Sequence, residues 1–213
     1  MATSQGGSSE HIHQTAAQIL LRSLDKKAPL LDLGAGRGEF AELLAGLDFN
    51  SIDACDGYFS PEETNQKIRF TRTDLNKDLP YGDSTFMGVT ALEVIEHLEN
   101  PRAFVREIAR ILKPGGLVLI STPNLESFTS LASLAFRGYP SAFAPACYPA
   151  HISPLLEIDL RRILKENSFI NARTIFSGQG RMPAMDLEWR KLLGPLARGK
   201  RFSDNYFITA KKA

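Results

Sequence analysis

Short strand-like runs alternate with helix-like periodicities along the first part of the chain. Runs that predict strands occur at residues 30–33, 51–56, 68–72, 87–92 and 117–121. Between them, apolar residues recur at the three- and four-residue spacing of helices, over residues 10–24, 38–47 and 101–112. Alternating strands and helices of this length predict an α/β fold with a doubly wound, mostly parallel sheet.

The alternation stops after residue 124. Residues 125–152 are rich in aromatic residues and prolines, and they predict a helix near 125–136 followed by an irregular lid. Further on, the pattern predicts a helix over 153–167, a strand over 172–176, a helix over 185–196 around Trp189 and a last strand over 206–210. We also expect a short helix over 61–66 and a disordered tail over residues 1–9, which are small and polar.

Composition indicates a single domain over residues 1–213, because 43% of the chain is hydrophobic and 23% is charged. A net charge of +1 gives no overall field that would favour nucleic acid or a membrane surface. The two cysteines, Cys55 and Cys147, lack the spacing of a metal site, which fits a reducing compartment. Without a long apolar stretch or a signal-peptide pattern, the sequence predicts no membrane span and a cytoplasmic location.

The first predicted strand ends at a glycine-rich turn, Asp32-Leu-Gly34-Ala-Gly36-Arg-Gly38, and a helical pattern follows at once. Glycines at such a turn let a ligand approach the backbone, and the helix start offers free N–H groups to an anionic group. The spacing differs from the G-x-G-x-x-G dinucleotide fingerprint, since Glu39 stands where the third glycine belongs. A phosphate-binding P-loop is excluded, because no Gly-Lys-Ser/Thr follows.

Polar residues stand at the ends of the predicted strands, where ligands of such sheets bind. They are Asp32, Asp56, Asp74, Glu93 and Asn124. Asp56 is suited to accept hydrogen bonds from both hydroxyls of a ribose. Asp53 is its rival, and the sequence favours Asp56 because it falls where the strand should end.

The glycine motif, Asp56, Asp74 and the segments Glu93-Val-Ile-Glu-His97, Lys113-Pro-Gly-Gly116 and Ser121-Thr-Pro-Asn124 resemble class I S-adenosylmethionine (SAM)-dependent methyltransferases of the type 11 and type 23 branches, including ubiquinone-biosynthesis O-methyltransferases. The resemblance implies a Rossmann-like, seven-stranded sheet whose last strand is antiparallel between its neighbours. It implies SAM as the cofactor and S-adenosylhomocysteine as the product. The cofactor-binding residues it implies are Asp32, Gly34, Ala35, Gly36, Asp56, Gly57, Asp74, Leu75, Leu92 and Glu93.

Glu93, Glu96 and His97 would share one face of a helix, and His151 closes the predicted lid. This set resembles the divalent-metal site of small-RNA 2′-hydroxyl methyltransferases and of some ubiquinone-pathway enzymes. Three interpretations stay open: a metal site formed by Glu93, Glu96, His97 and His151, a metal-free base role for His97 or His151, and a purely structural role. The sequence gives the metal less weight than the other two.

The function expected from the sequence is methyl transfer from SAM to a small molecule, with a hydroxyl as the acceptor group and in-line displacement as the chemistry. The aromatic, weakly charged lid favours an apolar or aromatic acceptor. One alternative is an RNA 2′-hydroxyl methyltransferase, supported only by the basic group Arg190, Lys191, Arg198, Lys200 and Arg201. The other is a SAM-binding module without turnover. The protein is expected to be a monomer or a homodimer.

Overall fold

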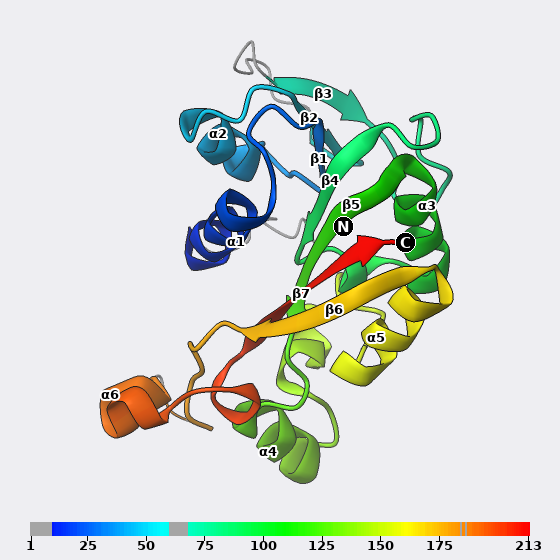
Figure 1. Ribbon diagram of the computed structural model, residues 1–213. Coiled ribbons are helices and arrows are strands. Elements are labelled where there is room, and N and C mark those ends of the chain that lie inside the picture. Colours follow the sequence, from blue (N-terminus) through cyan, green and yellow to red (C-terminus); the bar gives the residue numbers. More distant parts are fainter. Residues whose placement is uncertain (1–9, 60–67, 184, 186) are drawn as a thin grey trace.

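The computed structural model describes residues 10–59, 68–183, 185 and 187–213. Its centre is a seven-stranded sheet in the order β3-β2-β1-β4-β5-β7-β6 (Figure 1). Strand β7 is antiparallel to both neighbours, and the pairs among β1 to β5 are parallel, as predicted. The strands are β1 (Leu30–Leu33), β2 (Ile52–Asp56), β3 (Ile68–Arg72), β4 (Phe86–Leu92), β5 (Leu112–Pro123), β6 (Phe169–Phe176) and β7 (Asn205–Lys212).

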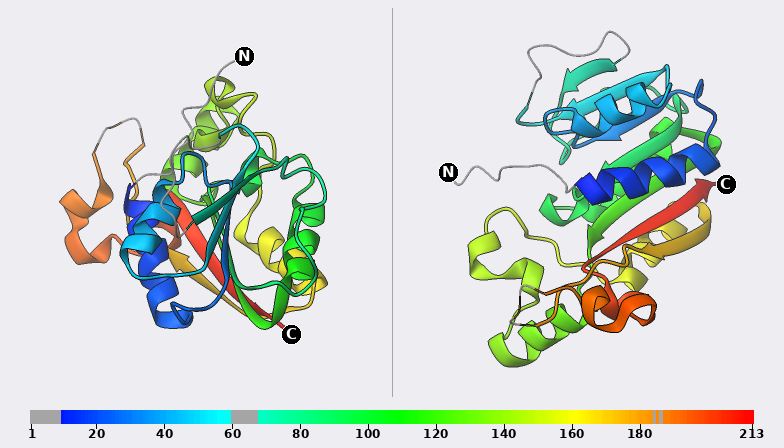
Figure 2. Two further views of the ribbon diagram at one scale, coloured as in Figure 1. Left: turned by 90° about the horizontal axis from the view of Figure 1, so that it is seen from above. Right: turned by 90° about the vertical axis from the view of Figure 1, so that its left-hand side faces the viewer.

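Helices cover both faces of this sheet. Helices α1 (Glu10–Ser23) and α2 (Glu39–Gly46) bury Leu20 and Phe40 in one apolar core. Helices α3 (Pro101–Ile111) and α5 (Glu157–Glu166) cover the opposite face of the sheet (Figure 2), and they bury Ile108 and Leu160 in the other core. Asn100 caps α3 as predicted, because its side-chain oxygen accepts a hydrogen bond from the N–H of Ala103 at 3.0 Å.

The remaining elements follow the strands at their carboxyl ends, and α4 and α6 lie at the bottom of Figure 1. They are α4 (Phe128–Arg137), α6 (Trp189–Leu193) and the short 3₁₀ helices η1 (Ile95–His97), η2 (Ser141–Phe143), η3 (Pro145–Cys147), η4 (Gly194–Leu196) and η5 (Lys200–Phe202). No helix of the described residues is both long and apolar enough to cross a membrane.

Two of the predicted helices are shorter in the structure than the sequence suggested. The helix expected from Ser153 begins only at Glu157, because the N–H of Ser153 is bonded to the carbonyl of Glu96 and holds this segment extended. The helix expected over 185–196 is reduced to α6 and η4, since Gly194 at φ 53° and Pro195 interrupt it.

Strand β6 begins at Phe169, earlier than the predicted residue 172, and a register irregularity lies between Ile170 and Arg173. The tail 1–9 and the whole of the helix expected over 61–66 lie outside the described residues.

Candidate functional site

The glycine turn after β1 is bound to the end of β2 through its backbone. The N–H groups of Gly34 and Ala35 both donate to the carbonyl oxygen of Cys55, at 2.9 and 3.0 Å. Gly34 has φ 73°, and a Cβ atom there would lie 2.4 Å from Cγ2 of Val94. The turn therefore needs glycine at position 34 for both conformation and space.

Asp56 is the last residue of β2, and its carboxylate points toward the glycine turn. Oδ2 accepts a hydrogen bond from the N–H of Gly36 at 3.0 Å, and Oδ1 accepts from Tyr58 and Phe59. Asp53 lies inside the strand, and its carboxylate is paired with Arg69 of β3 at 2.7 Å. Of the two aspartates, only Asp56 thus lies at the edge of the sheet where a ligand would bind.

Asp32 is buried below the turn, where Oγ1 of Thr90 donates a hydrogen bond to it at 2.7 Å. Burial raises the pKa of Asp32 to about 7; the Thr90 hydrogen bond opposes this, and the charge of Asp56 adds to it. A positive charge placed near the turn would therefore lower the pKa of Asp32 and favour its ionised form.

Asp74 and Leu75 follow the end of β3, beside Gly57. Oδ1 of Asp74 accepts a hydrogen bond from the N–H of Asn76 at 3.0 Å, and this bond is the main cause of its lowered pKa. A Cβ atom on Gly57 would lie 3.3 Å from the carbonyl oxygen of Thr73, so the two turns approach closely. The expected cofactor residues of β1, β2 and β3 are thus neighbours along one edge of the sheet.

Leu92 ends β4, and Glu93 follows it in the left-handed region at φ 55°. The Glu93 carboxylate accepts hydrogen bonds from Oγ of Ser121 at 2.9 Å and from Nδ2 of Asn205 at 2.6 Å. Burial raises the pKa of Glu93 to about 7, against the effect of these two bonds. A positive φ outside glycine is uncommon, and such strain is frequent at functional sites.

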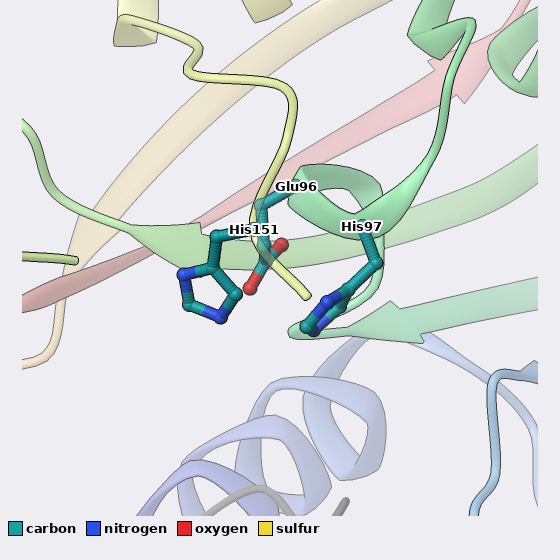
Figure 3. A group of neighbouring side chains, drawn as sticks. All are labelled: Glu96, His97 and His151. Atoms are coloured by element: carbon teal, nitrogen blue, oxygen red, sulfur yellow. The ribbon is translucent and has the colours of Figure 1, made fainter. Parts of the chain in front are cut away.

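Glu96, His97 and His151 come together just beyond this strand end, and Figure 3 shows the Glu96 carboxylate between the two imidazole rings. Each residue offers one ligand atom, and the three atoms lie within 4.8 Å of one another. Oε2 of Glu96 accepts a hydrogen bond from Oγ1 of Thr122 at 3.0 Å, whereas Oε1 is buried and has no hydrogen-bond partner among the described residues. The cluster therefore contains an unsatisfied carboxylate oxygen facing two imidazoles.

Both imidazoles are oriented by backbone carbonyl groups. Nδ1 of His97 lies 2.8 Å from the oxygen of Ala150, and Nδ1 of His151 lies 2.6 Å from that of Ala142. A carbonyl oxygen only accepts, so each Nδ1 is assigned the proton and each Nε2 keeps its lone pair. Burial lowers the pKa of His97, and the nearby carbonyls only partly oppose this. His97 is thus neutral near pH 7 and can accept a proton or bind a cation.

Burial also raises the pKa of Glu96 well above its usual range, and the charge of Glu93 adds to the effect. The same residue fixes the segment that carries His151, since the N–H groups of Ile152 and Ser153 both donate to its carbonyl at 3.0 Å. Glu96 therefore links the end of the predicted lid to η1 through its backbone while its carboxylate faces the histidines.

The structure brings together three of the four residues expected for a metal site and leaves out Glu93. The expected helix through residues 93–97 is only the 3₁₀ turn η1, so the spacing does not place all three side chains on one face. The Glu93 carboxylate turns instead to Ser121 and Asn205.

Three supporting residues were missed from the sequence. Ser121 and Thr122 lie in the recognised Ser-Thr-Pro-Asn segment, which was a usable signal for them. Asn205 had no such signal, since it lies 112 residues from its partner Glu93.

The chain is similar to known proteins in both sequence and fold. A family model described as "Methyltransferase domain" matches residues 9–172, most of the chain. The ubiquinone biosynthesis O-methyltransferases of Caulobacter vibrioides and Rickettsia typhi are 34% identical over 102 residues and 32% identical over 127 residues. These matches cover 45% and 56% of this chain, and 40% and 50% of the relatives, so the chain spans half their length or less.

Among solved structures, a SAM-dependent methyltransferase from Archaeoglobus fulgidus superposes with a TM-score of 0.65 at 20% identity, covering 94% of each chain. The fold is therefore that of Rossmann-like methyltransferases. Because the family model matches well over half of the sequence, the chain belongs to the class I SAM-dependent methyltransferases.

Proposed function

We propose that this protein transfers the methyl group of SAM to a hydroxyl of a small-molecule acceptor. The observation that carries the proposal is the position of the Glu96, His97 and His151 cluster, directly after the strand end that also carries Glu93. A hydroxyl must lose its proton during methylation, and an imidazole beside the proposed donor site, such as that of His97 or His151, suits this need. The relatives from C. vibrioides and R. typhi, both named O-methyltransferases, agree with a hydroxyl acceptor.

The strand-end residues fit SAM. When bound, SAM supplies a methyl group on a positively charged sulfur. Asp56 would accept hydrogen bonds from the ribose hydroxyls, Asp74 and the N–H of Leu75 would bind the adenine, and the turn Gly34 to Gly36 would lie against the amino-acid part. The carboxylates of Asp32 and Glu93 favour a cationic ligand, because burial raises the pKa of each and neither forms an ion pair within the part of the chain that the structure describes.

Positioning would contribute much of the rate, since well-oriented reactants gain roughly 7–11 kcal/mol relative to free ones. We propose that residues 125–152 serve as the lid that excludes water and holds the acceptor. Its end is attached beside the cluster by the bond from His97 to Ala150, so a closed lid and an assembled cluster would coincide.

The cluster also fits a divalent cation, which is the alternative to the metal-free base role, because a cation would occupy the two Nε2 atoms that would otherwise accept a proton. Two imidazole Nε2 atoms with Nδ1 bonded to carbonyls, together with an unpaired buried carboxylate oxygen, form a donor set suited to Zn²⁺ or Mn²⁺. A cation held there by Glu96, His97 and His151 would supply a positive charge that lowers the pKa of the acceptor hydroxyl. With or without a bound cation, His97, His151 and Glu96 would orient the acceptor oxygen toward the methyl group of SAM.

Methyl transfer is tested by incubating the protein with labelled SAM and a metabolite extract, followed by mass spectrometry of the labelled products. We expect an O-methylated product, and we expect S-adenosylhomocysteine to bind with a Kd on the order of micromolar in calorimetry. Absence of binding at millimolar ligand would contradict a SAM site. Binding without any labelled product would favour a module that binds SAM without turnover.

The metal is tested by a direct binding measurement. Calorimetric titration of chelator-treated protein with Zn²⁺ or Mn²⁺ should show one site in the wild type. The matched variant Glu96→Gln keeps the size of the side chain and should bind at least tenfold more weakly. Equal binding by the two proteins would place the cation elsewhere, and absence of binding by both would leave the histidines as metal-free bases.

The RNA alternative has lost support from the structure. Of the basic group that suggested it, Lys200 is paired with Glu126 at 3.0 Å and with Glu157 at 2.7 Å. Arg201 donates to the carbonyl of Glu126. These two cations stabilise the fold, so they are not free to bind a row of phosphates.

A further inference from the structure

The segment between β6 and β7 encloses a concavity that the proposed SAM site does not use. The cavity has a volume of about 420 Å³, and its lining includes two arginines and two glycines. The residues that line it are Ser177, Gly178, Arg190, Gly194, Pro195, Ala197 and Arg198. Its floor is therefore made of backbone and small side chains, and its charge comes from the two guanidinium groups.

Arg190 and Arg198 differ from Arg181 and Lys200, the two cations of this segment that form ion pairs. Arg181 is paired with Asp204 at 3.2 Å, and Lys200 bridges two glutamates. Within the described parts of the chain, neither Arg190 nor Arg198 has an ion-pair partner, and no carboxylate lines the cavity. Two unpaired guanidinium groups on one concave surface favour an anion, which they can bind through planar, paired hydrogen bonds.

The cavity lies at the edge of the sheet where the proposed methyl transfer takes place. Strand β6 is antiparallel to β7, which is itself antiparallel to β5, so β6 ends at the same edge as the parallel strands. The N–H of Ser177, in the cavity wall, donates to the carbonyl of Asn205 at 3.1 Å. Nδ2 of Asn205 donates to the Glu93 carboxylate at 2.6 Å. Asn205 thus connects the cavity wall to Glu93, which follows the end of β4 in the proposed SAM site.

The part of the wall that carries Arg190 packs against α4 and η5 through aromatic rings. The ring of Trp189, next to Arg190, lies 5.7 Å from that of Phe128 in α4 and 5.6 Å from that of Phe202 in η5. Phe128 and Phe202 pack edge to face at 5.2 Å, which completes a three-ring cluster. Helix α6 is therefore anchored to the helix that begins the proposed lid.

We propose that the methyl acceptor carries an anionic group, a carboxylate or a phosphate, and that Arg190 and Arg198 bind this group during catalysis. The inference rests on the proposed function, because it assigns a substrate class to the same reaction. It refines the expectation of an apolar or aromatic acceptor: the aromatic lid would cover the body of the molecule, and the arginine cavity would hold its charged end.

The first test uses simple anions as probes. Calorimetry or chemical-shift titration with inorganic phosphate and with acetate, at constant ionic strength, should show binding by the wild type. Arg190→Gln and Arg198→Gln should each weaken binding about tenfold or more, as expected for loss of a charge-assisted hydrogen bond. Lys191→Gln is the matched control, since Lys191 is exposed, carries the same charge and does not line the cavity. An equal loss in this control, or no loss in either arginine variant, would overturn the inference.

The second test uses the acceptors found with labelled SAM. Labelled products should be retained on an anion-exchange column, and phosphatase treatment would separate phosphate esters from carboxylates. Each arginine variant should raise the acceptor KM about tenfold or more with a smaller change in kcat, while affinity for S-adenosylhomocysteine stays unchanged. Uncharged products made equally well by the arginine variants would overturn the inference while leaving methyl transfer established. Absence of any product with the wild type would instead contradict the proposed function, and the anion titration would still decide whether the cavity binds anions.

Discussion

The imidazole rings of His97 and His151 lie edge to face, with their centroids 4.8 Å apart. One ring belongs to η1 after β4, and the other lies at the end of the proposed lid. Their contact joins the core of the sheet to the segment that would cover the acceptor. The pair is therefore the place where closing of the lid and chemistry at the acceptor would be coupled.

Replacing either histidine should slow methyl transfer and leave cofactor binding intact. We expect His97→Ala and His151→Ala to reduce turnover by about 10²–10⁴-fold, the usual contribution of a positioned acid or base. Calorimetry with S-adenosylhomocysteine should give an unchanged Kd. The variants His97→Asn and His151→Asn keep a side-chain N–H for the carbonyls of Ala150 and Ala142 but lack Nε2. If these variants are as active as the wild type, the histidines are only structural.

Asp56→Ala should weaken SAM binding by about 1.5–3 kcal/mol, because hydrogen bonds from the ribose hydroxyls to a carboxylate would be lost. Asp53→Ala is the comparison, since it removes a carboxylate that faces Arg69 instead of the glycine turn. Calorimetry on both variants measures the difference. A larger loss in Asp53→Ala would show that the ribose is bound elsewhere.

Gly34→Ala should destabilise the fold by about 2–4 kcal/mol, because the new Cβ atom would lie 2.4 Å from Val94 and the residue has φ 73°. Gly38→Ala is the matched control, with φ 88° but no atom within 4 Å of its Cβ position. The Gly38→Ala variant has the cost of the positive φ without a steric clash, so its free energy of unfolding should fall by about 1 kcal/mol. Urea unfolding of the two variants measures the difference, and equal losses would show that Val94 moves aside at little cost.

Glu157 should make stability depend on pH in the acidic range. Burial disfavours its charge, but hydrogen bonds from Lys200, Thr174 and Arg161 outweigh this and lower its pKa to about 2 from an ordinary 4.5. The pKa of Glu157 is lower in the folded state than in the unfolded state, so the ionised carboxylate stabilises the fold. This stabilisation is complete above about pH 4.5 and is lost as the pH falls toward 2.

Glu157→Gln should therefore cost about 2 kcal/mol at pH 7 and much less near pH 2. Urea unfolding across this range would measure the difference. A constant difference between variant and wild type would show that the charge of Glu157 contributes nothing.

The lid can be tested by hydrogen exchange. Residues 125–152 should exchange faster than β5 in the free protein, because η2 and η3 have no buried residues. Exchange there should slow when S-adenosylhomocysteine and the acceptor are both present, as a closing lid requires. Equal protection of the lid and β5 in the free protein would count against closure.

Much of the fold was predictable because its signals are local. The apolar runs, the glycine turn and the cap at Asn100 each lie within a few residues of the element they define. Buried strands must be apolar, and tight turns need glycine, whatever the rest of the chain does. The positions of Asp32 and Asp56 followed from the rule that parallel strands end at one edge.

The sequence by itself therefore determined the order of the elements, the class of protein and the edge of the sheet that carries the site. Only the tertiary structure decided which acidic residue faces His97 and His151: Glu96 does, and Glu93 bonds to Asn205, 112 residues away. It also decided that Lys200 is paired while Arg190 and Arg198 line a cavity. Such pairings depend on contacts between distant segments and on backbone angles such as the φ of Glu93, which no local pattern encodes.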